Sequence, residues 1–121
     1  MLGDVIAFVP TTDRARAREF YAGTLGLELV DESSFALVFR VNGTMLRVTT
    51  VQSFEPHPFT VLGWEVADVA ATIRTLSERG VTFARYDSVE QDELGVWTAP
   101  GGGRIAWFKD PDGNTLSVAQ F

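Results

Sequence analysis

The feature of this sequence that most constrains its fold is a pattern of elements that occurs twice. A run of residues typical of a β-strand is followed by an aspartate suited to cap a helix, first at Asp13 and again at Asp68. Glycines suited to end a helix follow at Gly26 and Gly80, and their spacing matches that of the two aspartates to within one residue. A repeat of this length predicts two similar supersecondary units in one chain.

Each unit is predicted to contain one helix and four strands, in the order β-α-β-β-β. Asn42-Gly43 in the first unit favours a tight hairpin turn between two of these strands. The strands expected in the first unit are Asp4–Val9, Leu27–Val30, Phe35–Val41 and Thr44–Val51. Those expected in the second unit are Thr60–Val66, Val81–Ala84, Arg104–Phe108 and Thr115–Gln120, with a further short strand at Val96–Trp97.

Together the two units predict a single α+β domain spanning residues 1–121. We expect unit one at about residues 1–51, a proline-containing linker at about 52–59, and unit two at about 60–121. With 45% hydrophobic and 21% charged residues, the chain has the composition of an ordinary globular protein, which is sufficient to build a core.

The charge and the missing cysteine exclude several kinds of function. The formal net charge is −6 at pH 7, which argues against nucleic acid and anionic membranes as partners. The absence of cysteine excludes disulfides, thiolate nucleophiles and cysteine metal ligands. No apolar run is long enough to span a bilayer, and the first residues do not resemble a signal peptide. We therefore expect a cytoplasmic location.

Two groups of residues carry a resemblance to a known family. The first is Asp13 with Glu19-Phe20-Tyr21 and Leu25-Gly26-Leu27, and the second is Phe108–Asn114 with its Asp-Pro-Asp-Gly turn. With these motifs and its repeated units, the chain resembles the vicinal oxygen chelate superfamily, which includes glyoxalase I, extradiol dioxygenases and bleomycin-resistance proteins. The resemblance implies an open, partly closed barrel-like cleft with the helices outside, and a homodimer.

In the metal-dependent members of that family, four inward-facing side chains, usually two His and two Glu, hold a divalent metal ion. The resemblance places Ile6, Arg47, Val61 and Ser117 at these positions. Isoleucine and valine have no donor atom, arginine is a permanent cation, and serine is a poor ligand at neutral pH. The sequence therefore predicts that the metal site is lost and that the protein binds no metal and no other cofactor.

Alternation along the strands predicts which side chains line the cleft. An apolar, aromatic lining with one arginine and one glutamate suits a flat organic ligand held by a few polar groups. The candidate ligand-binding residues are Phe8, Met45, Arg47, Glu65, Trp107 and Ser117. Arg47 either anchors a ligand carboxylate or pairs with Glu65, which is the commoner fate of a half-buried arginine. Trp107 could equally stack on a ligand or belong to the core or a dimer interface.

Two further side chains could serve a site, and each has a simpler interpretation. His57, the single histidine, could act as a general base, but its place between Pro56 and Pro58 favours an exposed linker residue. Trp97 could cover the cleft as a lid, although a loop anchor packed on the sheet is the favoured interpretation. The acidic residues of the loop Tyr86–Gly103 are expected to form a solvated surface rather than a site for a cationic ligand.

These residues favour a metal-free protein that binds a small aromatic or otherwise apolar organic molecule, as bleomycin-resistance members of the family do. Three alternatives stay open. The first is a divalent-metal-dependent lyase, isomerase or dioxygenase with ligands at other positions. The second is a metal-free enzyme that uses Arg47 and Glu65, and the third is a non-catalytic assembly module. No motif in the sequence identifies the ligand.

Overall fold

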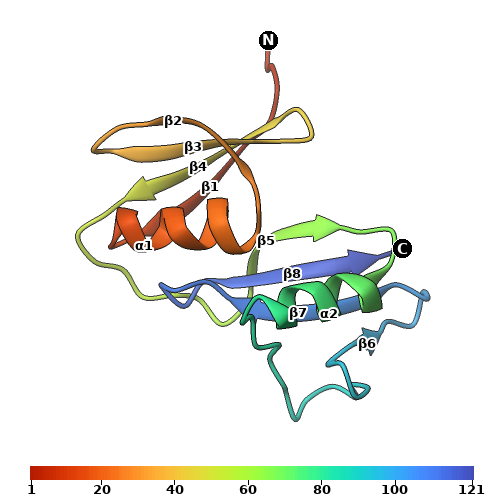
Figure 1. Ribbon diagram of the computed structural model, residues 1–121. Coiled ribbons are helices and arrows are strands. Elements are labelled where there is room, and N and C mark those ends of the chain that lie inside the picture. Colours follow the sequence, from red (N-terminus) through yellow and green to blue (C-terminus); the bar gives the residue numbers. More distant parts are fainter. The chain divides into compact units, whose positions relative to one another are not determined.

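The computed structural model describes the whole chain, Met1–Phe121. The chain divides into two compact units (Figure 1), Met1–Pro56 (unit 1) and His57–Phe121 (unit 2). The boundary between them lies within the linker expected at about residues 52–59. Each unit contains one helix and one mixed four-stranded sheet, so the predicted α+β class is confirmed, and no barrel is closed.

The sheet of unit 1 has the strand order β1-β4-β3-β2. Its first strand runs parallel to its last, and the other neighbours are antiparallel. The strands are β1 (Ile6–Thr11), β2 (Glu28–Glu32), β3 (Ala36–Val41) and β4 (Thr44–Thr50). Asn42 and Gly43 have positive φ angles of 46° and 85°. This is the backbone that the predicted turn between β3 and β4 requires.

The helical segment of unit 1 begins where the sequence predicted. Asp13 is extended, and its Oδ1 accepts a hydrogen bond from the backbone N–H of Arg16 at 3.1 Å, which caps α1 (Arg14–Arg18). The chain continues as a wider π-helical segment, Glu19–Thr24. Tyr21 of this segment is fully buried.

Unit 2 repeats this topology with the strand order β5-β8-β7-β6, in which β5 runs parallel to β8. Its elements are β5 (Thr60–Glu65), α2 (Val69–Glu78), β6 (Trp97–Thr98), β7 (Arg104–Lys109) and β8 (Thr115–Gln120). Asp68 caps α2 through a hydrogen bond from the backbone N–H of Ala71 to its Oδ1 at 3.0 Å. The predicted repeat of the two units is therefore present in the structure.

One predicted strand of unit 2 is wrong. Residues 81–84 form only an isolated bridge between Phe83 and Phe108, together with a hydrogen bond from the N–H of Ala84 to the carbonyl of Trp107 at 2.8 Å. The physical reason is that this segment and β6 pair with the same edge of β7. β6 pairs with Arg104 and Ile105 at one end of that edge, so residues 81–84 can pair only near Phe108 at the other end. The two-residue β6 replaces the predicted strand as the second strand of the unit.

A bulge in β5 breaks the simple alternation that the sequence suggested. Thr60 is paired with Thr115, and Leu62 is paired with Leu116. Val61 therefore has no partner of its own across the ladder. The extra residue places Thr60 on the same face of the sheet as Thr115, and this side chain becomes part of the site described below.

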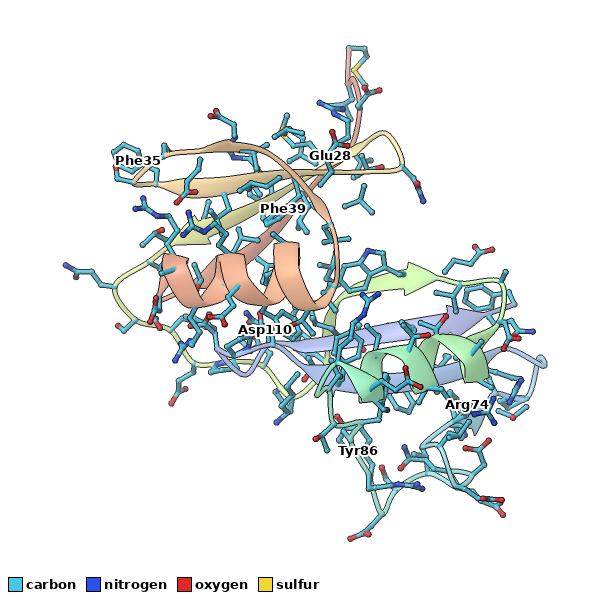
Figure 2. All side chains as sticks on the ribbon, viewed as in Figure 1. Glu28, Phe35, Phe39, Arg74, Tyr86 and Asp110 are labelled. Carbon is cyan, nitrogen blue, oxygen red and sulfur yellow. The ribbon has the colours of Figure 1, made fainter.

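Each sheet has one face covered by the helical segment of its unit, and we call the opposite face the open face. Tyr21 is fully buried on the covered face of unit 1, where its ring centroid lies 6.0 Å from that of Phe39, a β3 residue labelled in Figure 2. The other buried core residues of the two covered faces include Val9, Leu46, Val48, Ala106, Phe108, Leu116 and Val118. This packing leaves the alternate side chains of each sheet available to a site.

The helices of both units are short. The longer one, α2, has 10 residues. Neither is long and apolar enough to cross a lipid bilayer.

Candidate ligand-binding site

Trp107 is the centre of the candidate site because alternation along β7 turns it away from the core. Its neighbours Ala106 and Phe108 are buried on the covered face, whereas Trp107 lies half-buried on the open face of unit 2. Across the sheet, Trp107 is paired with Ser117 of β8. An aromatic ring on a sheet face that no helix of the unit covers is a surface on which a flat molecule can stack.

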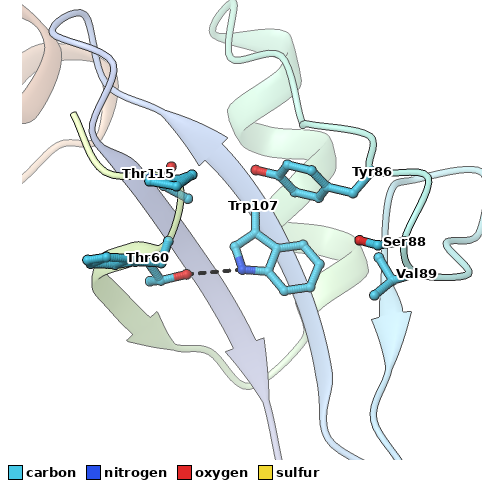
Figure 3. A pocket seen from close by; sticks show the side chains of 8 residues that line it. Thr60, Tyr86, Ser88, Val89, Trp107 and Thr115 are labelled. Atoms are coloured by element: carbon cyan, nitrogen blue, oxygen red, sulfur yellow. Dashed lines mark hydrogen bonds between the residues drawn. The ribbon is translucent and has the colours of Figure 1, made fainter. Parts of the chain in front are cut away.

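The indole of Trp107 is held by a hydrogen bond to a residue of β5. Its Nε1–H donates to the Oγ1 of Thr60 at 3.1 Å (Figure 3). Thr60 reaches this position because the bulge at Val61 brings it onto the open face beside Thr115. The polar edge of the indole is therefore satisfied within the protein, because Trp has no other donor. The ring face remains as the surface for contacts.

Two more aromatic side chains contact Trp107. The ring of Tyr86 meets it edge-on, with centroids 5.6 Å apart and planes at 80°. The ring of Trp97 stacks beside it, with centroids 6.1 Å apart and planes at 28°. Trp97 belongs to β6 and packs on the sheet, which agrees with the loop-anchor interpretation rather than with a mobile lid. The three rings form one aromatic cluster on the open face.

The loop that carries Tyr86 is fastened by the side-chain amide of Gln91. Its Oε1 accepts a hydrogen bond from the backbone N–H of Tyr86 at 2.7 Å. Its Nε2 donates to the carbonyls of Ala84 at 3.0 Å and Gly95 at 2.8 Å. The guanidinium of Arg85 donates to two further carbonyls of the loop. These bonds join the two ends of the loop and fix the place of Tyr86 beside Trp107.

Two rings of this cluster, those of Tyr86 and Trp107, line a pocket of about 310 Å³ in unit 2. This volume is at the lower end of those found for small-molecule sites. The lining combines apolar side chains with hydroxyl groups and includes no Asp, Glu, Lys, Arg or His (Figure 3). The lining residues are Pro58, Phe59, Thr60, Tyr86, Ser88, Val89, Trp107 and Thr115.

Three of the predicted ligand-binding residues lie in unit 2, and Trp107 is the one that lines this pocket. Ser117 lies on the same face and is 9% exposed. Its Oγ fills the space above Gly63, because a Cβ built on that glycine would collide with it. Glu65 is exposed further along β5, opposite Ala119, and does not line the pocket.

The other three predicted residues lie together on the open face of unit 1. Phe8 and Arg47 are direct partners in the parallel ladder, and Met45 precedes Arg47 by two residues on the same face. Two arginines of α1 form ion pairs with Glu32, but Arg47 forms no hydrogen bond or ion pair within unit 1. The predicted alternatives for Arg47, a ligand carboxylate or Glu65, both stay predictions.

The four positions that the family resemblance assigns to metal ligands do not suit a metal ion. Ile6 and Val61 offer no donor atom, Arg47 carries a fixed positive charge, and Ser117 alone has a side-chain oxygen that could approach a cation. Neither unit contains a group of three or more His, Asp or Glu side chains that could share an ion. The donor set of these residues therefore gives no basis for chemistry through a metal.

Sequence reasoning missed most of the residues that line the pocket, and the reasons differ. Thr60 was not expected on this face because simple alternation assigns Val61 to it, and only the bulge reverses that assignment. Tyr86 and Ser88 belong to a long loop whose path no local pattern determines. The only available signal was a tyrosine followed by the turn-forming residues Asp87 and Ser88.

The end of the predicted linker also belongs to the site. Phe59 lines the pocket, and the ring of His57 stacks parallel to it with centroids 4.9 Å apart. His57 is exposed and forms no hydrogen bond. This agrees with the linker interpretation of His57 and gives no support to a general base.

The comparison that decides the family is a match over most of the chain. The profile of the Glyoxalase/Bleomycin resistance protein/Dioxygenase superfamily matches residues 4–118. The chain belongs to this superfamily. A sequence comparison with curated proteins gives no match. The match agrees with the resemblance stated from the motifs around the first helix and the final hairpin.

Solved structures of other proteins share the fold. A glyoxalase family protein from Bacillus anthracis has a TM-score of 0.79 and 16% identity, covering 99% of this chain and 95% of that chain. A superfamily member from Sphaerobacter thermophilus has a TM-score of 0.76 and 26% identity, covering 100% of this chain and 98% of that chain. The antibiotic-binding protein TnmS3 from Streptomyces sp. CB03234 has a TM-score of 0.72 and 26% identity, covering 99% of this chain and 96% of that chain.

Proposed function

We propose that this superfamily member binds a small aromatic molecule in the pocket on Trp107 and that binding needs no metal ion. The observation that carries the proposal is the pocket itself, a space of about 310 Å³ whose lining includes the aromatic rings of Phe59, Tyr86 and Trp107. The ring of Trp107 offers a stacking surface whose orientation is fixed by Thr60. A rigid aromatic anchor is the feature most often responsible for binding energy in such sites.

The lining favours binding over catalysis. It contains hydroxyl groups, but a hydroxyl needs an adjacent base to act as a nucleophile. No histidine or carboxylate is among the lining residues. The positions corresponding to metal ligands supply no alternative source of activation, since Ile6 and Val61 have no donor atom. The arrangement therefore supports capture of a molecule rather than its conversion.

One relative adds independent support. TnmS3, which is 26% identical to this chain, is described as an antibiotic-binding protein. A binding function is therefore represented among proteins with this fold.

The test is a titration of ¹⁵N-labelled protein with 2-naphthol. Binding is monitored by NMR through the indole N–H signals of the three tryptophans. We expect the signals of Trp107 and Trp97 to shift and that of Trp64 to stay, because Trp64 stacks on Phe108 on the covered face. Trp107→Ala should weaken binding at least about tenfold, the loss typical of a central anchor. Trp107→Phe should retain most of the affinity, and the control Trp64→Phe all of it.

Metal independence is tested in the same titration. After dialysis against EDTA the affinity should be unchanged, and added zinc, iron(II), nickel or manganese should not increase it. A titration in which the Trp107 signal does not move up to the solubility limit of 2-naphthol would contradict the proposed site. Binding that appears only with a metal would show that the ligand is held through a metal site instead.

A further inference from the structure

The absence of charge in the pocket indicates which aromatic molecules it accepts, an inference that rests on the proposed function. None of the lining residues is Asp, Glu, Lys, Arg or His. His57 and Asp87 are next to lining residues in the chain, but neither side chain lines the pocket. An ion that enters would give up part of its hydration shell without meeting an opposite charge.

The hydroxyl groups of the pocket are available to a ligand. Thr60 Oγ1 accepts the indole N–H, which leaves its own hydroxyl proton free to donate. The hydroxyls of Tyr86 and Ser88 form no hydrogen bond within the protein. These groups can each donate to an oxygen of a ligand, and each can also accept from a ligand hydroxyl.

The balance of these effects separates neutral from ionised ligands. A neutral hydroxyl or carbonyl group loses its water but regains hydrogen bonds from the lining. A carboxylate or ammonium group loses a much larger hydration energy, and uncharged hydroxyls replace only part of it. The net charge of −6 would attract a cation over a distance, but exposed charges are largely screened at physiological ionic strength.

We propose that the pocket on Trp107 selects uncharged aromatic molecules that carry a hydroxyl or carbonyl oxygen and discriminates against ionised molecules of the same size. The ring face of Trp107 holds the aromatic body of the ligand. The hydroxyls of Thr60, Tyr86 and Ser88 hold its oxygen. The charge of the ligand therefore decides its affinity more strongly than small differences in its shape.

The test uses four probes with one ring system at pH 7: naphthalene, 2-naphthol, 2-naphthoate and 2-naphthylmethylammonium. Dissociation constants are taken from the shift of the Trp107 indole signal, so that binding at other places is not counted. We expect 2-naphthol to bind at least about tenfold more tightly than either ion, because neither ion finds a counter-charge. It should also bind several-fold more tightly than naphthalene, because naphthalene cannot use the hydroxyls.

Two variants connect the preference to the hydroxyls. Tyr86→Phe combined with Ser88→Ala should bring the affinity for 2-naphthol toward that for naphthalene, which should itself change little. Ser77→Ala, at an exposed position of α2, is the matched control and should change neither. An equal loss of affinity for 2-naphthol and for naphthalene in the double variant would overturn the assigned role of the hydroxyls.

Other outcomes would overturn the proposal in ways that can be told apart. Tightest binding of 2-naphthoate would show that a positive charge acts on the pocket and would make the ligand an acid. Tightest binding of the ammonium probe would show that the acidic surface acts on the pocket. In both cases the proposed binding function would stand and the inferred ligand class would fall. No shift of the Trp107 signal with any probe would contradict the function itself.

Discussion

At the scale of single residues, the hydrogen bond between Trp107 and Thr60 decides what the site can offer. An indole that keeps its N–H free can recognise a ligand acceptor, whereas here Thr60 Oγ1 accepts that N–H. What remains is the ring face, which recognises shape and aromatic character. This bond also fixes the ring, so that little side-chain entropy is lost when a ligand stacks on it.

Replacement of Thr60 by valine tests this bond at nearly constant volume. Thr60→Val should lower the free energy of unfolding by about 0.5–1 kcal/mol, since the indole N–H loses its partner near solvent. Hydrogen exchange of the Trp107 indole N–H should become faster. The control is Thr44→Val, at an exposed position in β4. An unchanged exchange rate in Thr60→Val would show that the bond does not hold the ring in solution.

At the scale of elements, the loop between residues 84 and 96 is as important as the sheet. The loop leaves the edge of β7 near Ala84 and returns to that edge at β6. Gln91 closes it with hydrogen bonds to both ends. A loop held by a few side-chain hydrogen bonds tends to open as a unit while the rest of the fold persists.

Gln91→Leu is expected to loosen this loop without unfolding the protein. Trypsin should then cleave more rapidly after Arg85, whose guanidinium is otherwise bound to loop carbonyls. The affinity for 2-naphthol should fall several-fold because Tyr86 is no longer positioned. Glu93→Gln, at an exposed position of the same loop, should change neither quantity. Equal cleavage rates in the two variants would contradict the positioning role of Gln91.

The turn between β7 and β8 depends on Asp110, which is only 5% exposed. Its Oδ1 accepts the backbone N–H groups of Asp112 at 3.0 Å and Asn114 at 2.9 Å, and its Oδ2 accepts Nδ2–H of Asn114 at 2.9 Å. This turn sets the register of the two strands that carry Trp107 and Thr115. The Asp-Pro-Asp-Gly motif is therefore a structural device that supports the site.

Asp110→Ala should lower the free energy of unfolding by about 2–3 kcal/mol, because several buried donors lose their acceptor. Asp110→Asn keeps one acceptor oxygen and should recover part of this loss. The neighbouring Lys109→Ala, at an exposed position, should have an effect near zero. Urea denaturation measures all three. A loss of less than about 1 kcal/mol in Asp110→Ala would mean that water replaces the carboxylate at little cost.

The elements themselves could be predicted because their signals are local. The caps Asp13 and Asp68 and the turn Asn42-Gly43 need only a few neighbouring residues to be recognised. The pocket could not be predicted because it depends on distant pairings. The bulge at Val61 reassigns a whole face, and Tyr86 reaches Trp107 only through the path of its loop.

At the scale of the whole molecule, the two units share a topology but differ in what they present. The open face of unit 1 carries Phe8, Met45 and Arg47, and that of unit 2 carries the aromatic pocket on Trp107. The longer second unit differs mainly by the loop before β6. The two units thus contain similar sheets, and the longer loop of unit 2 adds Tyr86, Ser88 and Val89 to the lining of the pocket.

The resemblance to the superfamily also implies a homodimer. We expect light scattering coupled to size-exclusion chromatography to give twice the chain mass of 13.3 kDa. The measurement should be repeated over a wide concentration range, because a weak dimer dissociates on dilution. A constant mass of one chain would contradict the expected dimer and leave the pocket of unit 2 to act in a monomer.

The sheets also carry protection against a hazard that open sheets share. In each unit the two outermost strands have one side without a partner in their own sheet, and such edges can recruit strands from other chains into aggregates. Here Pro10 removes a donor from β1, Asp31 and Glu32 place charge on β2, a bulge distorts β5, and β6 spans only two residues. The protein is therefore expected to tolerate the high concentrations at which weak ligands must be measured.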